Sequence, residues 1–153
     1  MEARVKEMFK YALALSILIA SISSINPSSA GQINWDKKLE KGYYELSIGN
    51  VDQAIKMFQE KVKGHPESAA CHTALGLALK KKGRLQEATV EFRAATAAEP
   101  TFANAFYELG VMQEANKDYA QALQAFEQYE QFSNDTYKKK TVEDRIRFCK
   151  EHI

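Results

Sequence analysis

The chain has 153 residues and an almost balanced charge, with 21 Lys and Arg against 20 Asp and Glu, so its formal net charge is +1. This balance gives no electrostatic reason to expect nucleic acid as a partner, and 45% hydrophobic residues exclude a compositionally disordered chain. The two cysteines, Cys71 and Cys149, are too few and too widely spaced for a disulfide framework or a metal-ligating cluster.

Residues 1–30 have the three parts of a secretory signal peptide. Basic residues precede an uncharged apolar run at residues 11–25, and Ser28 and Ala30 supply the small residues at positions −3 and −1 of a cleavage site. The run is shorter than the roughly 20 residues that a membrane-spanning helix needs. We therefore predict cleavage after Ala30 and export, most simply to a bacterial periplasm or cell envelope.

An uncleaved anchor is the alternative interpretation of the same segment. Residues 11–25 would then stay in the membrane, and the remaining chain would be a soluble head attached to it. Membrane contact is expected only through this N-terminal segment.

The sequence after residue 34 repeats with a period of 34 residues. An Ala-x-x-x-Phe motif occurs three times, and a glycine lies twelve residues before each of its alanines. The residues that share this step are Ala54 and Phe58, Ala88 and Phe92, Ala122 and Phe126, with Gly42, Gly76 and Gly110. Several residue types on one period are typical of a repeat protein.

The motif resembles the tetratricopeptide-repeat family, whose unit reads W-x2-L-G-x2-Y, then A-x3-F, then P. The second copy has His72-x2-Leu75-Gly76, and the third has the same Leu-Gly pair. The first copy departs from the pattern at Lys38 and Lys41, where large apolar residues are usual. The resemblance implies an all-α fold, a right-handed superhelical solenoid of three helical hairpins over residues 35–68, 69–102 and 103–136, after a short linker at residues 31–34.

Apolar spacing and turn residues predict two helices in each repeat. The expected ranges are 35–48, 51–64, 68–82, 85–98, 103–116 and 119–132. The tail adds an amphipathic helix at residues 137–153, with Val142, Ile146 and Cys149 or Phe148 on one face. We expect it to cap the third repeat, so a whole hairpin should separate the two cysteines and no bond should join them.

The resemblance also implies where a partner would bind, because the first helix of each repeat lines a concave face in this family. The slots there hold an apolar and aromatic strip, which we predict to be a partner-binding groove: Leu39, Tyr43, Leu46, Thr73, Leu77, Tyr107 and Val111. Chaperone-binding relatives place Lys and Asn in such slots to clamp a terminal carboxylate, and the matching positions here lack them. An apolar or amphipathic segment of a protein or peptide is therefore the expected partner, with the tail helix, residues 31–34 or a second copy of the chain as alternative occupants.

No catalytic motif, cofactor-binding motif or metal-ligand spacing is present. His65, His72 and His152 are isolated, and the lysine runs at 80–82 and 138–140 are interpreted as solubilising surface, with a lipid contact as the alternative. The sequence thus predicts a non-enzymatic adaptor or assembly factor outside the cytoplasm, without cofactors. A membrane-tethered structural subunit with a self-associating head is the alternative function.

Overall fold

The computed structural model describes residues 35–153, which contain helices and connecting turns and no strand. The expected signal or anchor segment and the linker lie outside these residues. The described helices are α2 (Trp35–Ser47), α3 (Val51–Gly64), α4 (Ala69–Lys81), α5 (Leu85–Ala98), α6 (Ala103–Ala115), α7 (Tyr119–Phe132) and α8 (Thr136–Glu151). Each begins and ends within two residues of the predicted range, and the all-α solenoid is confirmed.

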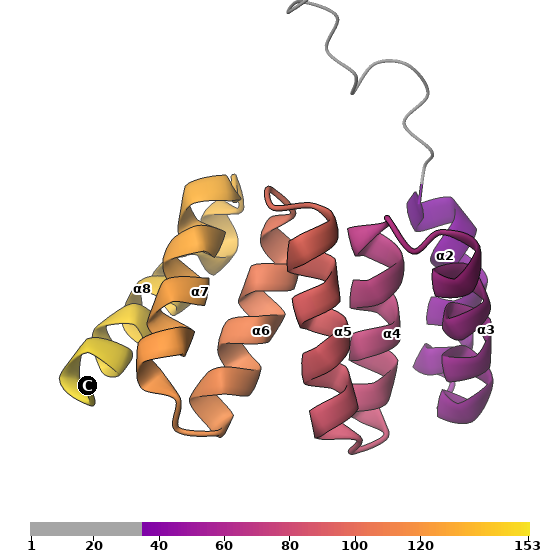
Figure 1. The fold of residues 1–153 in the computed structure, drawn as a ribbon, viewed down its shortest axis with the longest axis horizontal. Coiled ribbons are helices and arrows are strands. Elements are labelled where there is room, and N and C mark those ends of the chain that lie inside the picture. Colours follow the sequence, from indigo (N-terminus) through magenta and orange to yellow (C-terminus); the bar gives the residue numbers. More distant parts are fainter. Residues whose placement is uncertain (1–34) are drawn as a thin grey trace, which may run out of the picture. The chain divides into compact units, whose positions relative to one another are not determined.

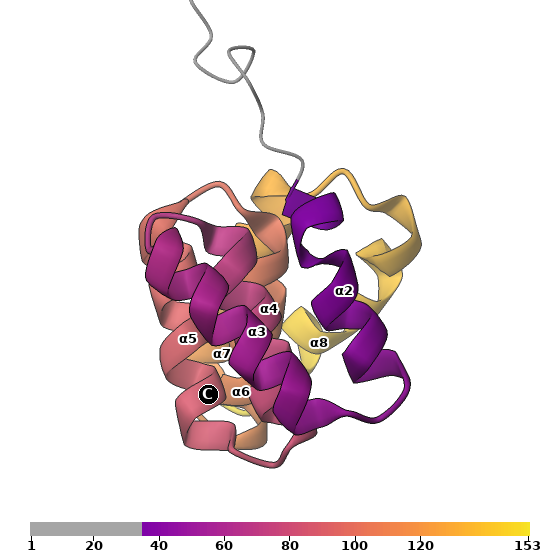
Figure 2. The same ribbon diagram turned by 90° about the vertical axis from the view of Figure 1, so that its right-hand side faces the viewer.

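The helices form a row of hairpins in chain order (Figure 1). Hairpins α2–α3, α4–α5 and α6–α7 stand side by side, and α8 packs against α7 at the far end. Viewed along the row, α2 and α8 lie on the same side, with α3 and α5 on the other (Figure 2). The first helices of the hairpins therefore share one face with the capping helix.

The turn inside each hairpin has one residue in the left-handed backbone region. Gly49 and Gly83 have φ values of +88° and +83°, as expected of glycine directly after a helix. The third repeat places Lys117 at the same step, with φ of 64°. The turn geometry is thus conserved through the three repeats although the third lacks the glycine.

The core of each hairpin is a phenylalanine ring set against a glycine. Phe58, Phe92 and Phe126 are at most 1% exposed, and each ring lies where the side chain of the repeat glycine would be. A first core cluster runs from Leu39 to Met112, and a second joins Phe126 and Tyr129 of α7 to the capping helix. The two helices of each hairpin therefore approach closely at the glycine, and this contact recurs in all three hairpins.

The two ends of the row are finished differently. Lys38 and Lys41 of α2 are exposed, whereas Leu75 and Leu109, which match Lys41 in the later repeats, are 3% and 8% exposed. At the other end α8 buries Val142 and Cys149 against the third hairpin. The first repeat thus has an exposed lysine where the later repeats have a buried leucine, and α8 covers the third hairpin.

Each cysteine belongs to a different part of the core. Cys71 lies in the first cluster and Cys149 in the second, and both are free thiols. Burial raises the pKa of both thiols.

Over residues 35–153, no helix is both long enough and apolar enough to cross a membrane.

Candidate partner-binding cleft

A cleft of about 220 Å³ opens on the face shared by the first helices and α8. Its walls come from α2, α4 and α6, with the loop before α6 and the start of α8 completing the rim. The lining residues are Leu39, Tyr43, Ala70, Thr73, Leu77, Phe102, Asn104, Tyr107, Glu108 and Lys138. The repeats bring together side chains that are far apart in the sequence because each first helix presents the same face.

Five of the seven residues predicted for the groove line this cleft. Tyr43 is 36% exposed, and Leu77 and Tyr107 are partly buried, so these three offer contact area. Leu39 and Thr73 are only 2% and 5% exposed and form the floor. Leu39 also belongs to the first core cluster, so it joins the floor of the cleft to the core.

The other two predicted residues lie outside the cleft. Leu46 packs against the first core cluster, and its backbone carbonyl accepts a hydrogen bond of 2.8 Å from Lys81. Val111 packs against the second cluster, beside the capping helix. The apolar strip is therefore shorter than the repeat slots suggested.

The capping helix accounts for the exclusion of Val111, because α8 reaches the groove face of the third repeat. Leu46 of α2 is excluded by its own packing against the first core cluster. Arg145 of α8 pairs with Glu114 of α6, and its guanidinium lies 5.7 Å from the ring centre of Phe126. The tail helix was an alternative occupant of the groove, and in the structure it covers part of it.

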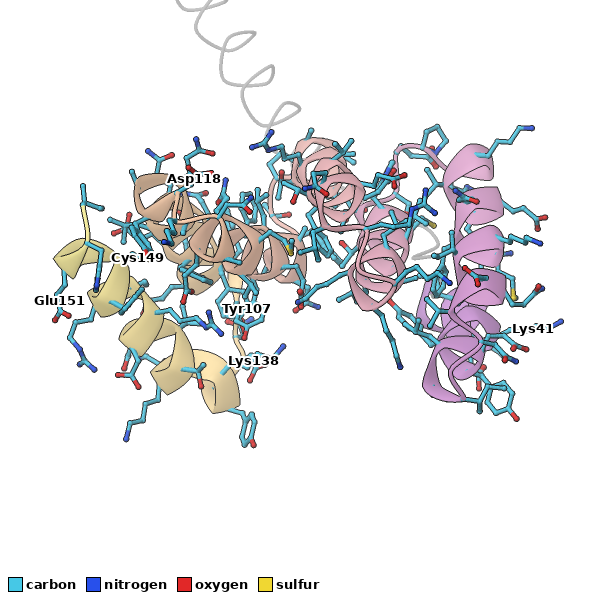
Figure 3. The ribbon with its side chains drawn as sticks, turned by 90° about the horizontal axis from the view of Figure 1, so that it is seen from below. Lys41, Tyr107, Asp118, Lys138, Cys149 and Glu151 are labelled. Carbon is cyan, nitrogen blue, oxygen red and sulfur yellow. The ribbon has the colours of Figure 1, made fainter. Side chains whose placement is uncertain are left out.

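Tyr107 lies between the part of the groove face that forms the cleft and the part that the capping helix covers. Its ring centre lies 5.4 Å from that of Tyr129 and 6.2 Å from that of Phe126. The Lys138 ammonium lies 4.9 Å from the same ring, and Figure 3 shows the two residues together. Tyr107 is thus a wall of the cleft that also contributes to the second core cluster.

Phe102, Glu108 and Lys138 line the cleft but were absent from the predicted site. Phe102 lies in a loop and Glu108 follows a groove slot, so the slot pattern could not identify them. Lys138 could have been found, because it lies one repeat length after Asn104. The repeat spacing of 34 residues extends into the capping helix at this position, so Lys138 corresponds to Asn104 of the third repeat.

The lysine run at 80–82 joins neighbouring helices. Lys80 pairs with Glu108 of α6 at 2.7 Å, and Lys82 pairs with Asp52 of α3 at 2.8 Å. The hydrogen bond from Lys82 lowers the pKa of the Asp52 carboxyl. With the bond from Lys81 to α2, each lysine of the run contacts a different helix, so the run makes specific contacts in addition to presenting charge at the surface.

His72 fills the aromatic slot of the second repeat and is 9% exposed. Its Nδ1 lies 2.7 Å from Glu91 Oε2, and its Nε2 lies 3.0 Å from the Pro66 carbonyl oxygen. These contacts tie α4 to α5 and to the loop before α4. No three His, Cys, Asp or Glu side chains gather as a metal site in the part of the chain that the structure describes.

Within residues 35–153, a larger cavity of about 470 Å³ lies between the end of α7 and the start of α8. Six of its eight lining residues are polar or charged, with Tyr129 and Val142 as the others. Its two apolar lining residues, Tyr129 and Val142, are only 2% and 1% exposed, whereas Tyr43 of the cleft is 36% exposed, so the cleft on the first helices is the better candidate for a partner segment.

Comparisons with known proteins agree with this architecture. The family model described as tetratricopeptide repeat matches residues 39–92 and 91–136. A search of curated proteins finds no match.

Three solved structures illustrate the similarity in fold. The TPR2B domain of yeast Sti1 in its pHsp70 complex is 22% identical with a TM-score of 0.67, covering 76% of this chain and 99% of that one. The Sgt2 TPR domain from Aspergillus fumigatus is 18% identical with a TM-score of 0.67, covering 81% and 82%. The Yersinia enterocolitica type III secretion chaperone SycD, in complex with a peptide of the translocator YopD, is 11% identical with a TM-score of 0.68, covering 79% and 95%. With the family model matching well over half of its length, the chain belongs to the tetratricopeptide-repeat family.

Proposed function

We propose that this protein binds a segment of a partner protein in the cleft of its first helices and performs no chemistry of its own. The observation that carries the proposal is the pairing of a partly exposed aromatic side chain, Tyr43, with the apolar Leu77 in a cleft on the face of the first helices. Tyrosine contributes large contact area at little entropic cost and is enriched where binding energy concentrates. Two similar solved structures are complexes, that of Sti1 with pHsp70 and that of SycD with a peptide of the translocator YopD.

Photo-crosslinking in cells tests the site directly. Tyr43 is replaced by p-benzoylphenylalanine, and irradiation should join the chain to its partner there. Tyr44 provides the matched control, because it is the next residue of α2 and is 61% exposed outside the cleft. A partner crosslinked from position 43 and not from 44 supports the cleft. Equal crosslinking from both positions, or crosslinking from 44 alone, would exclude it.

A substitution pair measures the contribution of the same wall. Tyr43→Ala should weaken partner retention by about 2 kcal/mol if Tyr43 is a binding hot spot. Tyr44→Ala should leave retention unchanged, and both variants should fold. Unchanged retention in Tyr43→Ala would contradict the proposal.

We further propose that the protein acts outside the cytoplasm, in a bacterial periplasm or envelope, after export by its N-terminal segment. The support is the sequence pattern of residues 1–30, with its short apolar run and small residues before the expected cleavage site. Mass spectrometry of the protein recovered from cells should give a mature N-terminus at Gly31. An intact Met1 in the membrane fraction would instead favour the retained anchor and the tethered structural subunit.

A further inference from the structure

The capping helix contributes a charge to the proposed binding cleft. Lys138 lies in the first turn of α8 and lines the cleft together with residues of α2, α4 and α6. Asp135 accepts hydrogen bonds from the backbone N–H groups of Tyr137 and Lys138 at 3.0 and 3.1 Å. This N-cap fixes the start of α8, and therefore the place from which the lysine reaches the cleft.

The charges on the cleft do not cancel. Glu108 is neutralised by Lys80, with 2.7 Å between Oε2 and Nζ. Lys138 has no ion pair with a carboxylate among residues 35–153, and its ammonium contacts the Tyr107 ring. Asn104 adds a neutral amide to the same lining. The cleft therefore combines apolar and polar side chains with one excess positive charge at its rim.

On this basis, and resting on the proposed function, we propose that the partner segment presents a large apolar side chain beside an Asp or Glu side chain. The apolar side chain packs against Tyr43 and Leu77, and the carboxylate meets the Lys138 ammonium. An ammonium over a ring keeps an open side on which it can accept an anion. Charge complementarity of this kind selects among partners that would otherwise bind by apolar contact alone.

An acidic side chain suits the site better than a chain-terminal carboxylate. Terminal carboxylates are usually held by several converging donors. The charged and amide groups of the cleft are the Lys138 ammonium, the Asn104 amide and Glu108, an acceptor already paired with Lys80, and its remaining polar groups are the hydroxyls of Tyr43, Thr73 and Tyr107. One ammonium beside an apolar wall fits a carboxylate carried on a side chain within the segment.

A random dodecapeptide library displayed on phage, with each peptide fused at its C-terminus, tests the proposal on the protein as recovered from cells. Only side-chain carboxylates can be selected there. Peptides that bind through Tyr43 should be enriched in Asp or Glu beside a large apolar residue. A selected peptide made synthetically should bind roughly fivefold more tightly than its Asn or Gln counterpart, and the difference should shrink at high salt.

Two charge reversals on the same helix provide the matched pair. Lys138→Glu should abolish or reverse the preference for the acidic peptide. Lys140→Glu makes the same change at an exposed position that does not line the cleft, and it should keep the preference. Circular dichroism melts of both variants check that α8 still folds.

The possible results distinguish a failure of the proposed acid preference from a failure of the proposed cleft binding. Peptides that need Tyr43 but show no acid preference, or a preference that survives Lys138→Glu, would overturn the inference and leave cleft binding intact. The absence of any peptide that depends on Tyr43 would overturn the proposed function itself. Sedimentation velocity could instead detect a dimer of the wild-type protein that Tyr43→Ala dissociates. That result would identify a second copy of the chain as the occupant of the cleft, and it would contradict both the partner protein and the acidic segment proposed for it.

Discussion

A methyl group placed on Gly76 would lie 2.6 Å from the nearest ring carbon of Phe92. The same relationship holds for Gly110 and Phe126 at 2.7 Å, and for Gly42 and Phe58 at 2.3 Å. Carbon atoms in contact normally stay 3.5 to 4.0 Å apart. The glycine therefore makes room for the ring, and the helices of each hairpin approach because of it.

Gly76→Ala should consequently destabilise the fold, although alanine is the better helix former by about 1 kcal/mol. Overpacking against a fully buried ring costs about 1 to 3 kcal/mol, and Phe92 is 0% exposed with no room to move. Gly64→Ala is the matched control, because no atom lies within 4 Å of its added carbon in the last turn of α3. Urea denaturation followed by circular dichroism should show a lower midpoint for Gly76→Ala only. A higher midpoint for Gly76→Ala would contradict the packing described.

Lys117 adopts a backbone conformation that costs a side chain about 1 to 2 kcal/mol. Its φ of 64° matches the turn positions of Gly49 and Gly83. Lys117→Gly should therefore raise the stability by up to about 1 kcal/mol and increase the melting temperature. Asn116→Gly, one residue earlier at φ of −82°, should give no gain. An equal rise in both variants would point to relief of some other strain.

Glu91 is predicted to stabilise the hairpin α4–α5 through His72. Removing the carboxylate in Glu91→Ala leaves a buried ring nitrogen without its partner at 2.7 Å, which should cost about 1 to 3 kcal/mol. His72→Phe places at this slot the residue type that the third repeat has at Phe106, and it removes the need for the partner. The double variant should then lose less stability than the sum of the two single variants. Additive losses in urea denaturation would show that the pair does not interact energetically.

The two thiols should react slowly in the folded protein. Burial raises the pKa of Cys71 and of Cys149, which lowers the fraction of each that is a reactive thiolate at neutral pH. Cys149 lies in the terminal helix, and Cys71 lies inside the row. Because terminal elements open locally at lower cost, Cys149 should be alkylated before Cys71 in native buffer. Mass spectrometry of timed iodoacetamide reactions gives the order, and faster labelling of Cys71 would place the weakest part of the fold elsewhere.

The sequence predicted the parts of this structure that follow from local chemistry. The period of 34 residues placed the six helices of the repeats, because the pairing of Gly76 with Phe92 recurs in each repeat, and the amphipathic pattern of the tail placed α8. The cleft was predicted less completely, since its extent depends on how α8 packs across the third hairpin. Val111 occupies a groove slot yet packs against the second core cluster, and Lys138 of the capping helix lines the cleft. The repeat register determines which residues lie on the groove face, and the packing of α8 determines which of those residues remain accessible to a partner.

The last prediction concerns the capping helix, whose removal should expose the apolar end of the third hairpin. Val142 is 1% exposed against Phe126 and Tyr129, so Val142→Asp places a carboxylate in the second core cluster. A buried charge without a partner costs several kcal/mol, and the helix should detach rather than accept it. Tyr137→Asp makes a similar change one turn earlier at a side chain that is 93% exposed, and it should be tolerated. Deleting residues from Thr136 onward should reproduce the effect of Val142→Asp. Sedimentation velocity and thermal melts should then show association and a lower melting temperature for the deletion and for Val142→Asp, with Tyr137→Asp unchanged. If the truncated chain stays monomeric and equally stable, the solenoid does not need α8 for its stability. The contact of Lys138 in α8 with the Tyr107 ring would then contribute little to the fold.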